Sequence, residues 1–134
     1  MSRRSVASLV SLTLLLPVVL GAAAVPPVEA QQGFYVAVAP YINTTHPCTY
    51  HAKGSCQAEL KNAALRFWLR STDGKVNRTG TVRAGSDGFV EWWLPHNKEY
   101  IVTFAYEGKR GTGSFVSYPK SATCITTIQL KPTP

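Results

Sequence analysis

The sequence predicts an all-β protein, a small antiparallel β-sandwich. Short segments of alternating apolar and polar residues recur along residues 31–134. Turn signals separate them at the spacing of about 8–12 residues that is typical of sandwiches. Almost no segment between residues 31 and 134 has the apolar period of an amphipathic helix.

The first half of this region contains three expected strands. Residues 34–39 alternate and are rich in β-forming side chains, and residues 64–70 repeat the pattern with two aromatic residues. The Asp73-Gly74 dipeptide then marks a turn, after which residues 76–82 form a short strand. These elements predict the beginning of an antiparallel meander.

The second half completes a set of about seven strands. Asp87-Gly88 makes a tight turn before the next strand, which Leu94-Pro95 ends. This turn-and-strand pattern resembles that of transthyretin-like and immunoglobulin-like secreted modules. The remaining expected strands span residues 89–94, 100–106, 113–117 and 122–130, with a turn at residues 107–110.

The amino terminus has the pattern of a secretory signal peptide over residues 1–30. Arg3 and Arg4 precede an apolar run over residues 9–20, and small residues follow up to Ala30. The run is shorter than the about 20 apolar residues that a transmembrane helix needs, and Pro17 interrupts it. We therefore expect cleavage after Ala30, or after Ala24, and no membrane segment in the mature chain.

The length favours a single domain over residues 31–134, and the signal peptide predicts that this domain lies in the periplasm or outside the cell. The net charge is +7, but the basic residues are spread along the chain without a cluster of interleaved aromatic residues. This distribution, together with secretion, excludes nucleic acid as an expected partner. Only seven acidic residues occur and none are paired in sequence, so hydrolytic catalysis is not expected.

The segment between Asn43 and Lys61 has little strand signal and carries most of the cysteine and histidine residues. It reads His46-x-Cys48-x-x-His51-x-x-x-x-Cys56, and Cys124 is the third cysteine. Soft thiolates with nearby imidazoles select Cu(I) or Zn²⁺, and three thiolates suit trigonal Cu(I). Zinc would need a fourth ligand, which one histidine could supply.

A disulfide is the alternative interpretation of the same residues. Cys48 and Cys56 could close a small loop, leaving Cys124 as a buried free cysteine and the histidines on the surface. The protein would then be a disulfide-stapled adhesion or ligand-binding module without a metal. The spacing by itself leaves both interpretations open.

Three motifs resemble those of the CueP family of periplasmic copper-binding proteins. They are residues 46–56, residues 88–95 (Gly-Phe-Val-Glu-Trp-Trp-Leu-Pro) and residues 123–130 (Thr-Cys-Ile-Thr-Thr-Ile-Gln-Leu), and they occur in the family's order. The resemblance covers residues 34–130 and corresponds to the carboxy-terminal domain of the better-known members.

The resemblance implies a ligand set and a role. It implies copper held by Cys48, Cys56 and Cys124, and we expect His46 and His51 to be ligands or close neighbours. It also implies copper tolerance, copper supply to a superoxide dismutase, and reduction of Cu(II) by the cysteines. The expected function is therefore periplasmic binding of Cu(I) by three thiolates, for tolerance, storage or delivery. Whether the protein is also an enzyme, as a thiol-dependent cupric reductase, stays open at this point.

Overall fold

The computed structural model describes residue 21 and residues 33–134, so the expected signal peptide lies almost entirely outside the described residues. Residues 33–134 form eight strands and no helix, which confirms the predicted all-β class. No helix long and apolar enough to span a membrane occurs in this part of the chain. The strands are β1 (Phe34–Val38), β2 (Ala64–Ser71), β3 (Asn77–Arg83), β4 (Val90–Leu94), β5 (Glu99–Tyr106), β6 (Lys109–Val116), β7 (Cys124–Ile125) and β8 (Lys131–Pro132).

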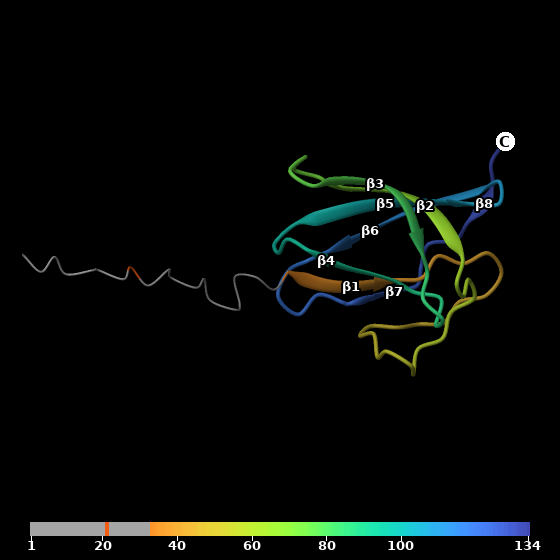
Figure 1. The fold of residues 1–134 in the computed structure, drawn as a ribbon, viewed down its shortest axis with the longest axis horizontal. Helices are drawn as coiled ribbons and strands as arrows, with labels where there is room; N and C mark the ends of the chain where they lie inside the picture. Colours follow the sequence, from red (N-terminus) through yellow and green to blue (C-terminus); the bar gives the residue numbers. More distant parts are fainter. Residues whose placement is uncertain (1–20, 22–32) are drawn as a thin grey trace, which may run out of the picture.

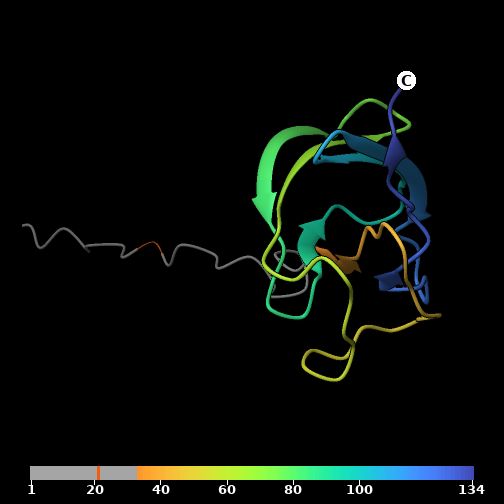
Figure 2. The ribbon, with the colours of Figure 1, turned by 90° about the vertical axis from the view of Figure 1, so that its right-hand side faces the viewer.

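The strands form two sheets that pack face to face. One sheet has the order β4-β1-β7 and the other the order β3-β2-β5-β6-β8. Every pairing is antiparallel except that of β1 with β7. Figure 1 shows the two layers, and Figure 2 shows the larger sheet curving over the smaller one.

The core lies between the sheets and is built from the alternating residues of each strand. In β2, Leu65 and Leu69 point inward between the exposed Arg66 and Arg70, as a strand's period of two requires. The larger sheet also supplies Val102 and Phe104 from β5. The smaller sheet contributes Val36, Val38, Val90 and Leu94, and the carboxy-terminal segment contributes Ile128 and Leu130.

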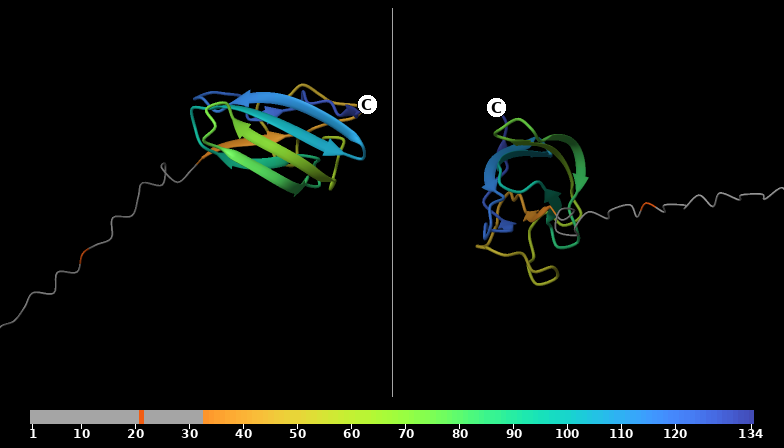
Figure 3. Two further views of the ribbon diagram at one scale, coloured as in Figure 1. Left: turned by 90° about the horizontal axis from the view of Figure 1, so that it is seen from above. Right: turned by 90° about the vertical axis from the view of Figure 1, so that its left-hand side faces the viewer.

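The β5–β6 hairpin is the longest local pairing, with a register that runs from Glu99 opposite Val116 to Tyr106 opposite Lys109. Its two-residue turn consists of Glu107 and Gly108, both with positive φ (47° and 72°). Two positive φ angles are characteristic of the type I′ turn, whose twist matches that of the paired strands. The hairpin is seen from above in Figure 3.

The prediction of one continuous strand over residues 122–130 is wrong. Only β7 pairs with β1; the chain then crosses to the other sheet, where β8 pairs with β6. The crossing passes so close to β6 that a side chain at Gly111 would meet the carbonyl oxygen of Gln129, and one at Gly113 would meet Ile128. The crossing segment therefore connects one edge of the smaller sheet to one edge of the larger sheet instead of extending a single sheet.

Candidate metal centre

The candidate site lies on the outer face of the smaller sheet. Because side chains alternate along β1, Val36 and Val38 enter the core while Ala37 points to the opposite face. There Ala37, Ala39, Phe89 and Cys124 form a second small apolar cluster, against which Cys48 and Cys56 pack. The small alanine side chains leave room for the sulfur atoms above the strand.

The loop of residues 43–61 covers this face and is held mainly by the segment around β7. The carbonyl oxygen of Thr49 accepts the amides of Thr123 (2.9 Å) and Cys124 (3.1 Å). The backbone amide of His51 donates to the hydroxyl oxygen of Thr123 at 3.2 Å. These bonds bring Cys48 and His51 beside Cys124, which the pairing of Ala37 with Cys124 places on the same face.

The far end of the loop is fastened to the turn before β4. The amide of Ala58 donates to the carbonyl of Asp87 at 2.7 Å. Gly88 adopts φ +86°, and a Cβ there would lie 2.8 Å from the carbonyl oxygen of Ala58. Only glycine satisfies both the positive φ and the close backbone approach at this position.

Glu59 fastens the beginning of the loop to its end. Its carboxylate accepts the amides of Ile42 and Asn43. Burial acts to raise the pKa of this carboxyl, but the backbone donors outweigh burial and hold the pKa below its usual range. The ionised form of Glu59 therefore closes the loop at neutral pH.

The three cysteines meet on this face, and two of them are oxidised. Cys48 and Cys124 form a disulfide with a Cα–Cα distance of 5.5 Å. Cys56 is a free, half-buried thiol whose Sγ lies 3.7 Å from the Sγ of Cys48. The prediction that Cys48 pairs with Cys56 and leaves Cys124 as the spare thiol is wrong for the described structure, because the bonds from Thr49 to the β7 backbone bring Cys48 to Cys124.

Each of the two loop histidines lies close to two of the three sulfur atoms. The donor atoms of His46, Cys48 and Cys56 lie within 4.8 Å of one another, and so do those of His51, Cys56 and Cys124. Cys56 belongs to both groups. All five residues singled out from the sequence thus come together, whereas His96 belongs to neither group and contacts Phe34 instead.

His51 is the most unusual of these residues, because its side chain is only 1% exposed and neither ring nitrogen has a hydrogen-bond partner. Its ring packs against Phe89, with 4.2 Å between the ring centroids. The Nε2 atom lies 3.5 Å from Asp87 Oδ2 and 3.8 Å from Glu91 Oε1, which is too far for a hydrogen bond. Burying ring nitrogens without a hydrogen bond costs about 1–3 kcal/mol, which ligation of a metal would offset.

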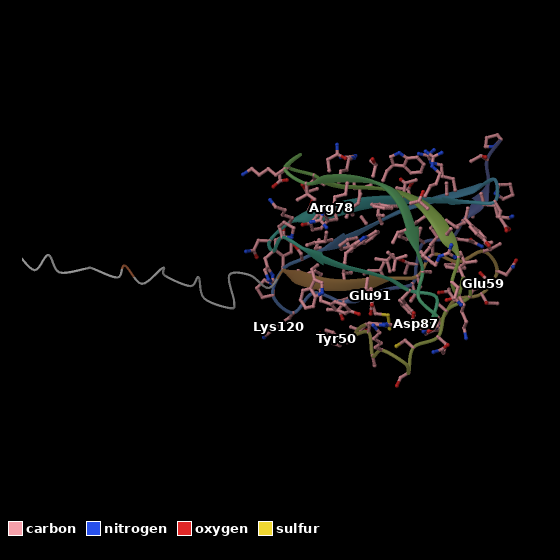
Figure 4. All side chains as sticks on the ribbon, viewed as in Figure 1. Tyr50, Glu59, Arg78, Asp87, Glu91 and Lys120 are labelled. Atoms are coloured by element: carbon pink, nitrogen blue, oxygen red, sulfur yellow. A yellow bond between two sulfur atoms is a disulfide. The ribbon has the colours of Figure 1, made fainter. Side chains whose placement is uncertain are left out.

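An acidic group next to the cluster was not expected from the sequence. Asp87 and Glu91 are four residues apart in the chain, on the turn and on β4, and converge on His51. The Tyr35 hydroxyl donates to Glu91 at 2.6 Å, and burial together with this bond raises the tyrosine pKa. Two features of the sequence could have indicated this acidic pair: the Asp-Gly turn, which contains Asp87, and the outward-facing position of Glu91 on the next strand. Figure 4 shows Asp87, Glu91 and Tyr50 on the side of the smaller sheet, away from Arg78.

The fold and the site define a class of protein, a small β-sandwich with soft donor atoms gathered on one face. The comparisons with known proteins agree with this class. A family model described as "Periplasmic copper-binding protein CueP" matches residues 3–129. The chain belongs to the CueP family of periplasmic copper-binding proteins.

A solved structure of a CueP protein has a similar fold. The structure described as "Crystal Structure of S.CueP" matches with a TM-score of 0.70 and 31% sequence identity, over 75% of this chain. The match spans 64% of the length of that chain. No curated protein matches the chain significantly.

Proposed function

We propose that the reduced protein binds one Cu(I) ion through the thiolates of Cys48, Cys56 and Cys124. Membership in a family described as copper-binding supports copper as the metal, and the meeting of three sulfur atoms on one face supports the ligand set. Thiolates are soft ligands, and three of them satisfy the low coordination number of Cu(I). Zinc is the less favoured metal because a closed zinc site needs four ligands.

The buried His51 supports the inner side of this site. Its two ring nitrogens lack hydrogen-bond partners, and one of them lies within 4.8 Å of the sulfurs of Cys56 and Cys124. His46 is half-buried and lies on the outer side with Cys48 and Cys56. We assign His51 as an additional ligand or immediate neighbour of the metal, and His46 as a donor at the solvent side.

The three-thiolate site is tested by titrating the fully reduced protein with Cu(I) against a chromophoric chelator, with native mass spectrometry for stoichiometry. We expect one ion per chain and a loss of affinity of at least about tenfold in Cys48→Ser, Cys56→Ser and Cys124→Ser. Ser55→Ala, next to Cys56 but outside the cluster, is the matched control and keeps the wild-type affinity. Unchanged binding in Cys124→Ser would disprove the three-thiolate site.

We also propose that the same cysteines reduce Cu(II). Two thiols give up two electrons to two Cu(II) ions, producing two Cu(I) ions, two protons and one disulfide. The Cys48–Cys124 bond in the described structure supports these two residues as the oxidised pair. Each event consumes the pair, so repeated turnover requires an external thiol reductant.

Reduction is tested by mixing the reduced protein with excess Cu(II) and a Cu(I)-specific chelator. We expect about two Cu(I) per chain with concurrent loss of two thiols, as the electron balance requires. Cys48→Ser, which removes one member of the pair, is expected to lower this yield, whereas Ser55→Ala does not. A full yield of Cu(I) without loss of thiols would contradict the mechanism.

The proposed role is copper tolerance through storage or delivery in the periplasm, with a superoxide dismutase as one recipient. A soft, partly exposed site suits an ion that must be both held and passed on. Mixing the Cu(I)-loaded protein with a copper-free periplasmic superoxide dismutase tests delivery. Metal transfer faster than release to a chelator of equal affinity supports it, and transfer at the rate of release contradicts it.

A further inference from the structure

The free thiol lies next to the disulfide in a way that the copper site by itself does not explain. Cys56 Sγ is 3.7 Å from Cys48 Sγ, and Cys48 is already bonded to Cys124. A thiolate beside a disulfide sulfur is the reactant arrangement of thiol–disulfide exchange. The three sulfur atoms are therefore placed for exchange of a disulfide bond as well as for binding of a metal.

We propose that the oxidised protein interconverts between two disulfide isomers, with Cys56 as the attacking thiolate. Cys56 Sγ bonds to Cys48 Sγ, the Cys48–Cys124 bond breaks, and Cys124 leaves as the thiolate. One disulfide and one thiol are present before and after the step, so no oxidant or reductant is consumed. The use of this exchange in a copper cycle rests on the function proposed above, but the exchange itself does not.

The loop tip permits the movement that the exchange requires. The bond length of a disulfide is about 2.05 Å, so the sulfur of Cys56 must approach by about 1.7 Å. The amides of Ser55 and Cys56 bond only to the nearby Ala52 carbonyl, within the tip itself. Gly54, at φ +85°, has open space around it. The tip can therefore shift without breaking the bonds that hold the loop to β7.

The exchange changes how exposed the disulfide sulfurs are to an external reductant. Cys124 is 3% exposed, whereas Cys48 and Cys56 are both half-buried in the surface loop. The second isomer therefore places both sulfurs of the disulfide in the loop and leaves the buried Cys124 as a thiol next to His51. Access of the attacking thiol limits disulfide reduction. A disulfide with both sulfurs in the surface loop favours reduction by an external dithiol, and we infer that such a reductant is the partner.

The proposal is tested on the copper-free oxidised protein, equilibrated at neutral pH and then acidified and unfolded, which stops exchange because thiolates are absent. The free thiol is then blocked with methyl methanethiosulfonate in acid, and disulfides are mapped by mass spectrometry. We expect two isomers, Cys48–Cys124 with Cys56 labelled and Cys48–Cys56 with Cys124 labelled. Cys56→Ser is the matched control and gives only the first bond. A wild-type protein that contains only Cys48–Cys124 would overturn the proposal.

The rate of the exchange is measured by separating the isomers in acid and following their return to equilibrium at neutral pH. No copper is present, so loss of Cu(I) binding and loss of exchange are independent results that distinguish the two proposals.

Discussion

The β5–β6 hairpin and the loop that carries Cys48 and Cys56 hold their backbones in opposite ways. The hairpin pairs with itself over eight register positions and turns on two residues. The loop contains no strand, and its main attachments are to residues distant in the chain, at Asp87, Thr123 and Cys124. The hairpin can form from local sequence, whereas the site can form only after the sandwich has closed.

The core-facing residues should therefore dominate stability. Phe104, on β5, is fully buried and stacks on Trp92 of the other sheet. We expect Phe104→Ala to lower the free energy of unfolding by about 3–5 kcal/mol, because it leaves a cavity between the sheets. Urea unfolding measures this, with the exposed Ser114→Ala as a control that changes stability by less than about 0.5 kcal/mol. A loss below about 1 kcal/mol would show that the sheets do not depend on this contact.

A substitution where the loop meets the sheet should affect the loop more than the core. Gly88→Ala adds strain at positive φ and a clash with the Ala58 carbonyl. We expect a loss of about 2–3 kcal/mol and weaker Cu(I) binding. Gly74→Ala has the same sign of φ but open space around it, so it should lose only about 1 kcal/mol and keep its copper affinity. Equal effects of the two substitutions would contradict the role of the close approach.

The smallest expected effect is a pH dependence at the β2–β3 turn, remote from the loop. The Lys98 ammonium, followed by the Ser71 hydroxyl and the Lys75 amide, holds the pKa of Asp73 well below its usual range. A lowered folded-state pKa means that the stabilisation is present above the unfolded pKa of about 3.9 and is lost as pH falls through the lower folded value.

Asp73→Asn should therefore unfold more easily than the wild type at neutral pH, with the difference shrinking as the pH falls below about 4. Urea unfolding across this pH range measures the difference. Because Asp73 is exposed, the effect is expected to be small. A difference that persists unchanged at the lowest pH would show that the substitution disrupts the turn for a reason other than charge.

The contrast between hairpin and loop also explains which sequence-based predictions succeeded. The six strands predicted before residue 122 correspond to β1–β6, because each depends on a period of two and on a nearby turn. The last strand was predicted wrongly, because its residues alternate although the chain changes sheets after β7. Local pattern cannot reveal a crossing that depends on Gly111 and Gly113 of another strand.

The structure brings together the five residues that the sequence singled out, but the sequence did not predict which cysteines are bonded. The spacing of His46, Cys48, His51 and Cys56 identified a chemical cluster, since four such residues in one short loop are already close in space. Which sulfur pairs with Cys48 depends on the distant backbone around β7, and the burial of His51 depends on the Phe89 ring just before β4. Both are long-range contacts that no spacing in the loop contains.

By itself, the sequence determined the all-β class, the strands up to β6, the candidate donor residues and, through its motifs, the family. Alternation, turn residues and residue chemistry are local properties, so they can be recognised before folding is known. The tertiary structure alone decided the Cys48–Cys124 bond, the position of Cys56 beside it, and the burial of the His51 imidazole without a hydrogen-bond partner. Those features arise where three distant segments meet on one face of a sheet, and their geometry exists only in the folded chain.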